Sequence, residues 1–120
     1  MTEIKSSKRY DLEERTLRFA KEVIEFVSTL PKIVANIEIM KQVIRSSGSV
    51  GSNYIEANEA LSKKDFTMRV KICRKEAKES RYWLRLIEVS EEDAEKTRQS
   101  LVNEATELMK IFGSIVEKAK

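Results

Sequence analysis

The chain has 120 residues, a length that fits one domain with a hydrophobic core of its own. Charged residues make up 36% of it, while three glycines and one proline are its only strong helix breakers, so a strand-and-turn or a disordered chain is disfavoured and long helices are expected. The absence of histidine excludes histidine-ligated metal or haem sites and triads with a histidine base, and the single cysteine excludes thiolate zinc and iron–sulfur centres.

The first ten residues are polar and carry no periodic pattern, so residues 1–10 are expected to form a flexible N-terminal arm ahead of a single domain over residues 11–120. Asp11 followed by Glu14 is a capping-box pattern, and it predicts a first helix from about Leu12 to Ser28. Its inward positions repeat at heptad spacing and are Leu12, Thr16, Phe19, Val23, Phe26 and Leu30. Pro31 should end this helix, because proline lacks the amide that the helix needs.

A second helix is expected to begin between Lys32 and Ile37, with Asn36 as a candidate cap. Its inward positions are Met40, Val43, Ser47, Val50, Tyr54, Ala57 and Leu61. The run from Ser46 to Asn53 has poor helix propensity, and a loop is the alternative there. The apolar spacing nevertheless continues through this run without a phase slip, so we predict a helix through it, with a kink.

Two further helices show the same capping chemistry, a serine followed three residues later by aspartate: Ser62 with Asp65, and Ser90 with Asp93. The inward positions of the third helix are Phe66, Val70, Cys73, Ala77, Ser80, Leu84 and Ile87. Those of the fourth are Ala94, Leu101, Ala105, Leu108, Phe112, Ile115 and Ala119. Four helices joined by short connections predict an all-α protein, an up-down-up-down antiparallel four-helix bundle.

The third helix carries most of the chain's excess positive charge: residues 62–85 contain nine Lys and Arg against three Asp and Glu. Seven of these cations share one side of the helix and are named here the cationic strip: Lys64, Lys71, Arg74, Lys75, Lys78, Arg81 and Arg85. One interpretation is a solvated face that acids of the fourth helix partly neutralise. The other is a surface that binds the phosphate backbone of RNA or DNA, with Tyr82 on the same arc as a possible stacking partner for a base.

A second apolar side of the third helix lies about 120° from its inward side on a helical wheel. It is named here the apolar edge and consists of Met68, Ile72, Trp83 and Leu86. Because one bundle core cannot bury both sides, we expect this edge to contact another copy of the chain. Glu76 lies between the two sides and needs a partner, either Arg45 or Arg69 within the chain or a group across a subunit contact whose register it would fix.

A polar strip on the second helix consists of Gln42, Arg45, Ser49, Asn53 and Glu56, with Ser46 expected on the same outer side, and its alternative interpretation is a solvated face. Two Glu-x-x-Glu pairs, Glu56 with Glu59 and Glu76 with Glu79, are the only pattern that suggests a metal-dependent hydrolase. Glu76 lies about 20 Å along the third helix from the turn that holds Glu59, so the pairs are at different heights. We therefore expect no enzyme, no metal and no cofactor.

No stretch resembles a signal peptide or supplies about 18 uninterrupted apolar residues, so we expect a cytoplasmic protein without a membrane partner. Cys73 cannot form an internal disulfide and fits a small buried hydrophobic position.

Two segments carry a family resemblance: QVIRSSGSVGSNYIEAN (42–58) and SKKDFTMRVKICRKEAKESRYWLRLIE (62–88). The most specific residues are Ser49, Val50, Ser52, Asn53 and Glu56, followed by Lys64, Asp65 and Phe66. The chain resembles the four-helix-bundle proteins encoded in intervening sequences of bacterial 23S ribosomal RNA genes, and also the accessory variability proteins of diversity-generating retroelements. The resemblance implies a ring-shaped homo-oligomer, a pentamer, with a basic surface suited to nucleic acid, and it supplies no established activity.

Together these features predict a non-enzymatic homo-oligomer that binds RNA or DNA. The alternative is a protein-interaction adaptor or scaffold that does not bind nucleic acid directly.

Overall fold

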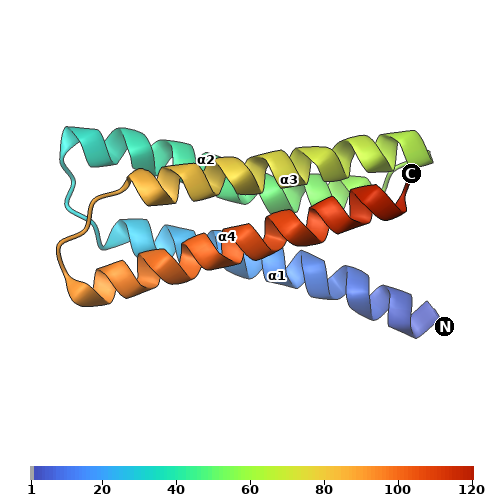
Figure 1. Cartoon of the computed structure of the whole chain (residues 1–120), viewed down its shortest axis with the longest axis horizontal. Helices are drawn as coiled ribbons and strands as arrows, with labels where there is room; N and C mark the ends of the chain where they lie inside the picture. Colours follow the sequence, from blue (N-terminus) through green and yellow to red (C-terminus); the bar gives the residue numbers. More distant parts are fainter. Residues whose placement is uncertain (1) are drawn as a thin grey trace.

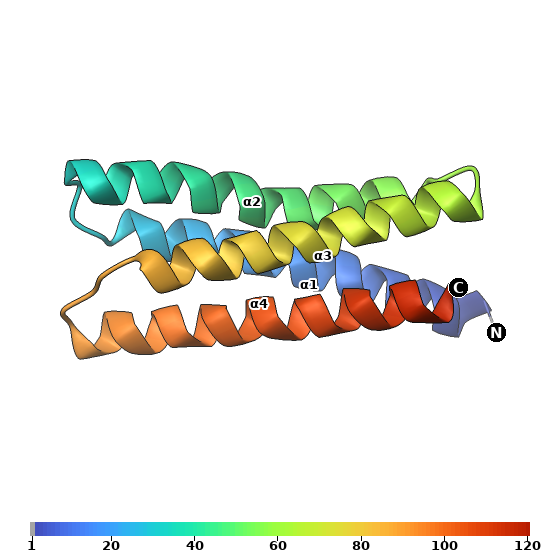
Figure 2. The same cartoon turned by 45° about the horizontal axis from the view of Figure 1, so that its top comes forward.

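Helices make up nearly all of the described chain in the computed structural model, which describes the backbone of residues 2–120 and the side chains of residues 11–120. They are α1 (Thr2–Ser28), α2 (Val34–Asn58), α3 (Lys63–Leu86) and α4 (Glu92–Lys118). Figures 1 and 2 show successive helices running in opposite directions along a body of 47 × 23 × 19 Å. This confirms the all-α, up-down-up-down antiparallel four-helix bundle.

Each helix packs against its neighbours in the chain, and α1 also packs against α4, which closes the bundle. The contact between α1 and α4 is the least extensive of the four. Figure 1 shows why: the N-terminal part of α1 diverges from the bundle at the end where α4 finishes. The α1–α4 side is therefore the most open side of the molecule.

The start of α1 differs from the sequence-based expectation. The helix begins at Thr2 and not at Leu12, so Asp11 lies inside the helix and does not cap it. The first ten residues contain neither glycine nor proline, and nothing in their sequence forces a break before Asp11. The division into an arm and a domain stays a prediction.

The second helix is unbroken from Val34 to Asn58, so the prediction of a helix through the serine- and glycine-rich run is confirmed. Asn36 is not the cap: it is buried and its Nδ2 donates a hydrogen bond to the carbonyl oxygen of Pro31 at 3.0 Å. The capping position is Ile33, whose side chain makes no capping bond.

The two serine caps have different outcomes. Ser62 caps α3, because its Oγ accepts a hydrogen bond from the amide of Asp65 at 3.0 Å, as predicted. The prediction for Ser90 is wrong, since α4 begins one residue later and Glu91 occupies the capping position without a side-chain bond. Ile87 is buried just after α3, so core packing of this connection sets where α4 can start.

The core consists largely of the inward positions predicted from the heptads. Leu61 is an exception: it is fully exposed, because α2 has already ended at Asn58. Near the end of α4, Val116 is buried and Ile115 only partly so. A seven-residue repeat drifts about 20° per heptad on a straight helix, so after three heptads from Ala94 the next residue points inward.

Small side chains bring α2 and α3 close together in the middle of the bundle. The hydroxyls of Ser46 and Ser80 are buried and lie 2.8 Å apart, so Ser46 belongs to the core and not to the outer polar side of α2 where the sequence suggested it. Burial raises the pKa of the neighbouring Cys73 thiol to about 12, which keeps it protonated and makes it a packing residue rather than a nucleophile.

Gly51 lies where α1 and α2 approach each other closely. A Cβ atom at this position would lie 2.9 Å from Thr16 Oγ1, and that hydroxyl is already bonded to the carbonyl oxygens of Leu12 and Glu13. Threonine is branched at Cβ and cannot rotate away easily. A Cβ at Gly48, in contrast, would meet no atom within 4 Å.

We therefore expect Gly51→Ala to be less stable than Gly48→Ala by about 1–2 kcal/mol, because both gain the same helix propensity but only the first is overpacked. Urea denaturation at chain concentrations where the midpoint no longer depends on concentration measures the difference. Equal midpoints for the two variants would contradict the close approach of α1 and α2.

Candidate nucleic-acid interface

The cationic strip runs along the outer side of α3, between the contact with α4 and the apolar edge. The exposed members are Lys64, Lys71, Lys75, Lys78 and Arg85. Arg74 and Arg81 are half-buried and lean toward α4: Arg81 Nη1 donates to Thr106 Oγ1 at 3.4 Å, and the side chain of Arg74 passes over Gly113. The two arginines thus join the strip to the α4 side of the bundle.

None of the seven strip cations forms an ion pair with a carboxylate among residues 11–120. The acids of α4 pair elsewhere, mostly with bases on α4 or just after it: Glu92 with Lys96, Glu95 with Arg98, Glu107 with Lys110 and Glu117 with Lys120. Among residues 11–120, the acids of the fourth helix therefore form no direct ion pair with the strip. The positive charge of α3 is left facing the solvent, where it can attract a polyanion.

The apolar edge is only partly free. Met68 and Leu86 are exposed, whereas Ile72 and Trp83 are half-buried and Trp83 packs against the core. The indole Nε1 of Trp83 donates to Glu79 Oε1 at 3.3 Å, and the Tyr82 ring meets the indole edge-on at 5.1 Å between centroids. The exposed apolar surface of this edge therefore has two separate parts, Met68 near the start of α3 and Leu86 at its end.

Glu76 has a partner within the chain. It is only 6% exposed, and its Oε1 lies 3.3 Å from Nη2 of Arg45, which also contacts Glu79 Oε1 at 2.6 Å. These hydrogen bonds, that to Glu76 first, raise the pKa of Arg45. Of the partners that the sequence left open for Glu76, the structure shows Arg45. This arginine contacts both Glu76 and Glu79, which lie one helical turn apart on α3.

Arg69, the other candidate partner, bonds to the polar strip of α2. Its Nη1 donates to Asn53 Oδ1 at 3.2 Å, and Asn53 Nδ2 donates to the Ser49 carbonyl and hydroxyl oxygens, both at 2.9 Å. Gln42 and Glu56 are exposed. The polar strip thus contacts α3 at two separate places, through Arg45 and through Asn53 with Ser49, and its other two members are left to solvent.

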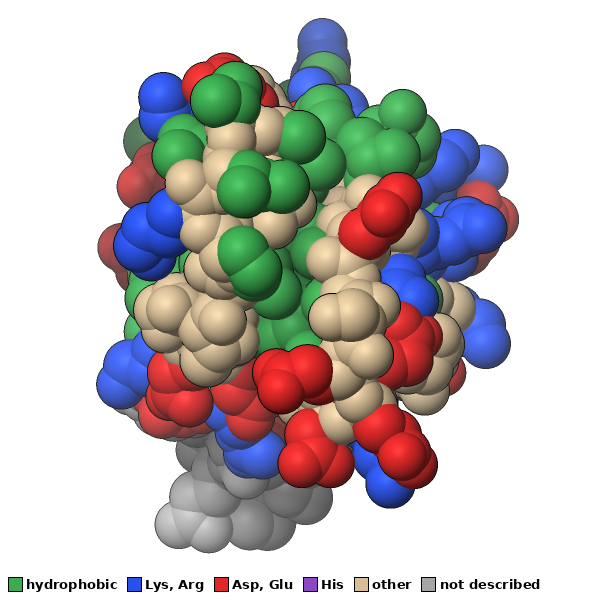
Figure 3. Space-filling model, turned by 90° about the vertical axis from the view of Figure 1, so that its left-hand side faces the viewer, with side chains coloured by type: hydrophobic (Ala, Val, Ile, Leu, Met, Phe, Trp, Pro, Cys, Tyr) green, Lys and Arg blue, Asp and Glu red, His purple; other side chains and the backbone are tan. Residues whose placement is uncertain are grey.

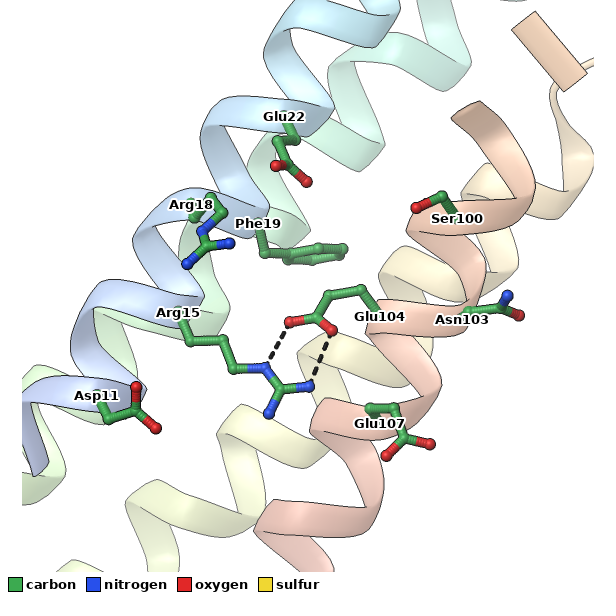
Figure 4. Close-up of a pocket in the computed structure, with 9 residues that line it drawn as sticks. All are labelled: Asp11, Arg15, Arg18, Phe19, Glu22, Ser100, Asn103, Glu104 and Glu107. Carbon is green, nitrogen blue, oxygen red and sulfur yellow. Dashed lines mark hydrogen bonds and ion pairs between the residues drawn. The ribbon is translucent and has the colours of Figure 1, made fainter. Parts of the chain in front are cut away.

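Sequence reasoning missed a groove between α1 and α4 (Figure 4). Arg15 crosses it to form two hydrogen bonds with Glu104, at 2.7 and 2.9 Å, and this pairing raises the pKa of Arg15. Phe19 lies beside the pair, and the cavity measures about 570 Å³. Arg15 and Glu104 each adjoin an inward position, Thr16 or Ala105, and this is the sequence pattern that could have indicated the pair. Because the two residues are 89 positions apart, the sequence alone did not show that they meet.

Two further observations concern the described part of the chain. No three acidic or cysteine side chains among residues 11–120 converge in a way that could hold a metal ion. None of the helices there is long and apolar enough to cross a lipid bilayer.

The fold and this surface define a class: a four-helix bundle whose third helix displays an unpaired row of cations. Residues 8–114 match the family described as 23S rRNA-intervening sequence protein, and the chain belongs to that family. A solved structure with a TM-score of 0.73 is a protein of unknown function from the S23 ribosomal protein family of Bacteroides thetaiotaomicron VPI-5482. It is 32% identical, and the alignment covers 87% of this chain and 96% of that one. No curated protein matched.

Proposed function

We propose that this protein is a cytoplasmic, non-enzymatic homo-oligomer that binds RNA or DNA through the cationic strip of α3. The observation that carries the proposal is the row of seven cations without an ion pair among residues 11–120. From Lys64 to Arg85 the row spans about 31 Å at 1.5 Å per residue, long enough to contact several successive phosphates. The names of the family and of the solved relative, which refer to ribosomal RNA and ribosomal protein, support it.

The chemistry of the strip favours recognition of the nucleic-acid backbone rather than of a base sequence. Lysine ammonium groups on flexible stems contact phosphates as point charges, and five of the seven strip members are exposed on one side of a rigid helix. Tyr82 is exposed beside them and offers one ring for stacking. We therefore infer binding that depends strongly on salt and weakly on sequence.

Fluorescence anisotropy with a labelled single-stranded RNA tests the function. If four to seven strip cations contact phosphates, log affinity should fall against log salt with a slope of roughly −3 to −5. The absorbance of the purified protein at 260 nm would report any nucleic acid bound in the cell. The proposal would be refuted if the RNA did not bind at low salt, or if its affinity did not change with salt.

Self-association, a pentamer by the resemblance, is proposed to use the apolar edge: Met68, Ile72, Trp83 and Leu86. Glu76, which is part of the proposed interface, is buried and paired with Arg45 at 3.3 Å. We expect Leu86→Glu to lower the particle mass in native mass spectrometry, because a buried carboxylate without a partner opposes association. Leu61→Glu is the matched control, since Leu61 is also exposed but lies in the α2–α3 turn. An unchanged particle mass in Leu86→Glu would show that the apolar edge is not part of the interface.

The adaptor alternative also has an observation in its favour. Figure 3 shows apolar side chains gathered on the end of the bundle that carries the α1–α2 connection, where Ile33 and Val34 are exposed. A protein partner could cover this end, and its capture would be insensitive to salt and to nuclease. The proposed kinship of the family with the accessory proteins of retroelements belongs with this alternative.

A further inference from the structure

The first two helices share an exposed aliphatic face that the proposed function does not use. Leu17 and Ile24 lie on one side of α1, seven residues apart, and Ile44 and Ile55 on one side of α2, eleven residues apart, both spacings that keep side chains aligned on a helix. Each of the four is between 41% and 51% exposed. They flank the line where Gly51 meets Thr16, so the four side chains border one shallow face.

Gly48 lies on this face, between Ile44 and Ile55. Glycine lowers helix propensity in the middle of a helix, and at Gly51 the close approach of Thr16 explains it. No atom lies within 4 Å of the place where a Gly48 side chain would begin. Packing inside one subunit therefore does not require a glycine there, whereas a helix backbone that docks from outside would.

The charges that border the face have a symmetric arrangement. On α1 the exposed Glu14 and Lys21 have their midpoint between residues 17 and 18. On α2 and just past its end, the exposed Lys41 and Glu59 have their midpoint at residue 50. Ile44 and Ile55 have theirs between residues 49 and 50. Of the two aliphatic α1 side chains, Leu17 lies at the α1 midpoint and Ile24 about two turns to one side of it.

Both helices place this midpoint at the same height in the bundle. Gly51 contacts Thr16 and the helices are antiparallel, so residue 50 of α2 lies level with residue 17 of α1. An acid on one side of the midpoint and a base at an equal distance on the other is the pattern that a two-fold axis requires of a self-complementary surface.

We propose that a second copy of this chain docks on the aliphatic face about a two-fold axis perpendicular to the helices. In this dimer α1 lies antiparallel to α1 of the partner subunit, and α2 antiparallel to α2. Lys41, which in the subunit forms an exposed ion pair with Glu38 at 3.5 Å, then meets Glu59 of the partner subunit. Lys21 meets the partner's Glu14, and each of the two contacts occurs twice. Gly48 meets the partner's Gly51, so the two α2 backbones approach closely at the centre.

The size of the face sets the strength of this contact. From Lys41 to Glu59 it is about 27 Å long, and two helices of about 10 Å each make it on the order of 500 Å² per copy. A total near 1,000 Å² is at the lower limit for a specific interface. The dimer is therefore expected to be weak and to form in the micromolar range or above.

The test is a charge swap, measured by sedimentation equilibrium in a Leu86→Glu background so that the apolar edge of α3 does not contribute. Lys41→Glu places two like-charged pairs across the axis, as does Glu59→Lys, and each should weaken self-association roughly tenfold. The double variant Lys41→Glu/Glu59→Lys should regain the original affinity. So should an equimolar mixture of the two single variants, because each then meets the charge that it lacks.

Leu17→Glu places a carboxylate at the centre of the contact and should abolish dimers while circular dichroism shows the same helix content, since Leu17 is exposed in the subunit. A Leu86→Glu chain that stays monomeric at all concentrations would overturn the proposal, and so would a double variant that does not regain affinity. RNA binding in the same samples reports separately on the cationic strip, so the two proposals can fail independently.

Discussion

Replacement of Lys71, Lys75 and Lys78 by glutamate should weaken binding to single-stranded RNA by a factor on the order of 10²–10³ at low salt. The three lysines are exposed and unpaired at the centre of the cationic strip, at spacings of four and three residues that place them on one side of α3. Their removal takes away three phosphate contacts, and the new carboxylates repel the same phosphates. The salt slope should fall by about 2, at roughly 0.7 per contact on a single strand.

Net charge alone would also weaken binding, so the control must carry the same change in charge. Arg18, Lys32 and Lys96 are exposed on α1, the α1–α2 connection and α4. Their combined replacement by glutamate changes the net charge equally but leaves α3 untouched, and it should reduce affinity only a few-fold. Equal losses in the two triple variants would show that the strip has no special role, and thermal unfolding of both would verify that the fold is retained.

The features of the fold that follow from local chemistry could be predicted from the sequence. Ser62 caps α3 because its hydroxyl lies within reach of an amide three residues away, whatever the rest of the chain does. The run from Ser46 to Asn53 stays helical because its apolar residues keep the phase of the buried face, and core packing outweighs the weak propensity of serine and glycine.

The features that depend on how two helices are rotated and aligned could not be predicted. Glu76 could pair with Arg45 across the α2–α3 contact or with Arg69 on its own helix, and the register between α2 and α3 decides that Arg45 binds Glu76 while Arg69 binds Asn53 of α2. The exposure of Leu61 depends on where α2 stops, which its heptad pattern does not encode.

The candidate site shows the same division. The cationic strip needs only the 3.6-residue period of one helix, so its members could be placed on one side of α3 from the sequence. That these cations have no ion pair among residues 11–120 required the positions of the α4 acids, which pair along α4. Trp83 is half-buried because it packs against the core, which the sequence of α3 alone does not show. The exposed part of the apolar edge is therefore limited to Met68 and Leu86.

Arg45→Met should lower the free energy of unfolding by about 2–3 kcal/mol. Removing one partner of a buried ion pair commonly costs about 3–5 kcal/mol, and the lower figure allows for Arg45, which is half exposed and screened by solvent. The cost arises from Glu76, whose carboxylate is left in the interface between α2 and α3 without its guanidinium. Urea denaturation of the variant measures it.

Two companion variants separate this cost from the loss of the arginine stem. Glu79→Gln keeps Glu76 paired and alters only the more exposed carboxylate, so it should cost about 1 kcal/mol or less. Arg45→Met/Glu76→Leu replaces both charges by apolar groups and should recover most of the stability, because no buried charge then lacks a partner.

The same series distinguishes a role for Glu76 within one subunit from a role between subunits. If Arg45 alone compensates Glu76, the loss in Arg45→Met is the same at every chain concentration. A loss of less than about 0.5 kcal/mol, or one that disappears as concentration rises, would mean that a group on a second copy also reaches this carboxylate. In that case Glu76 would set the register of a subunit contact along α3, as well as supporting the edge that carries Met68 and Leu86.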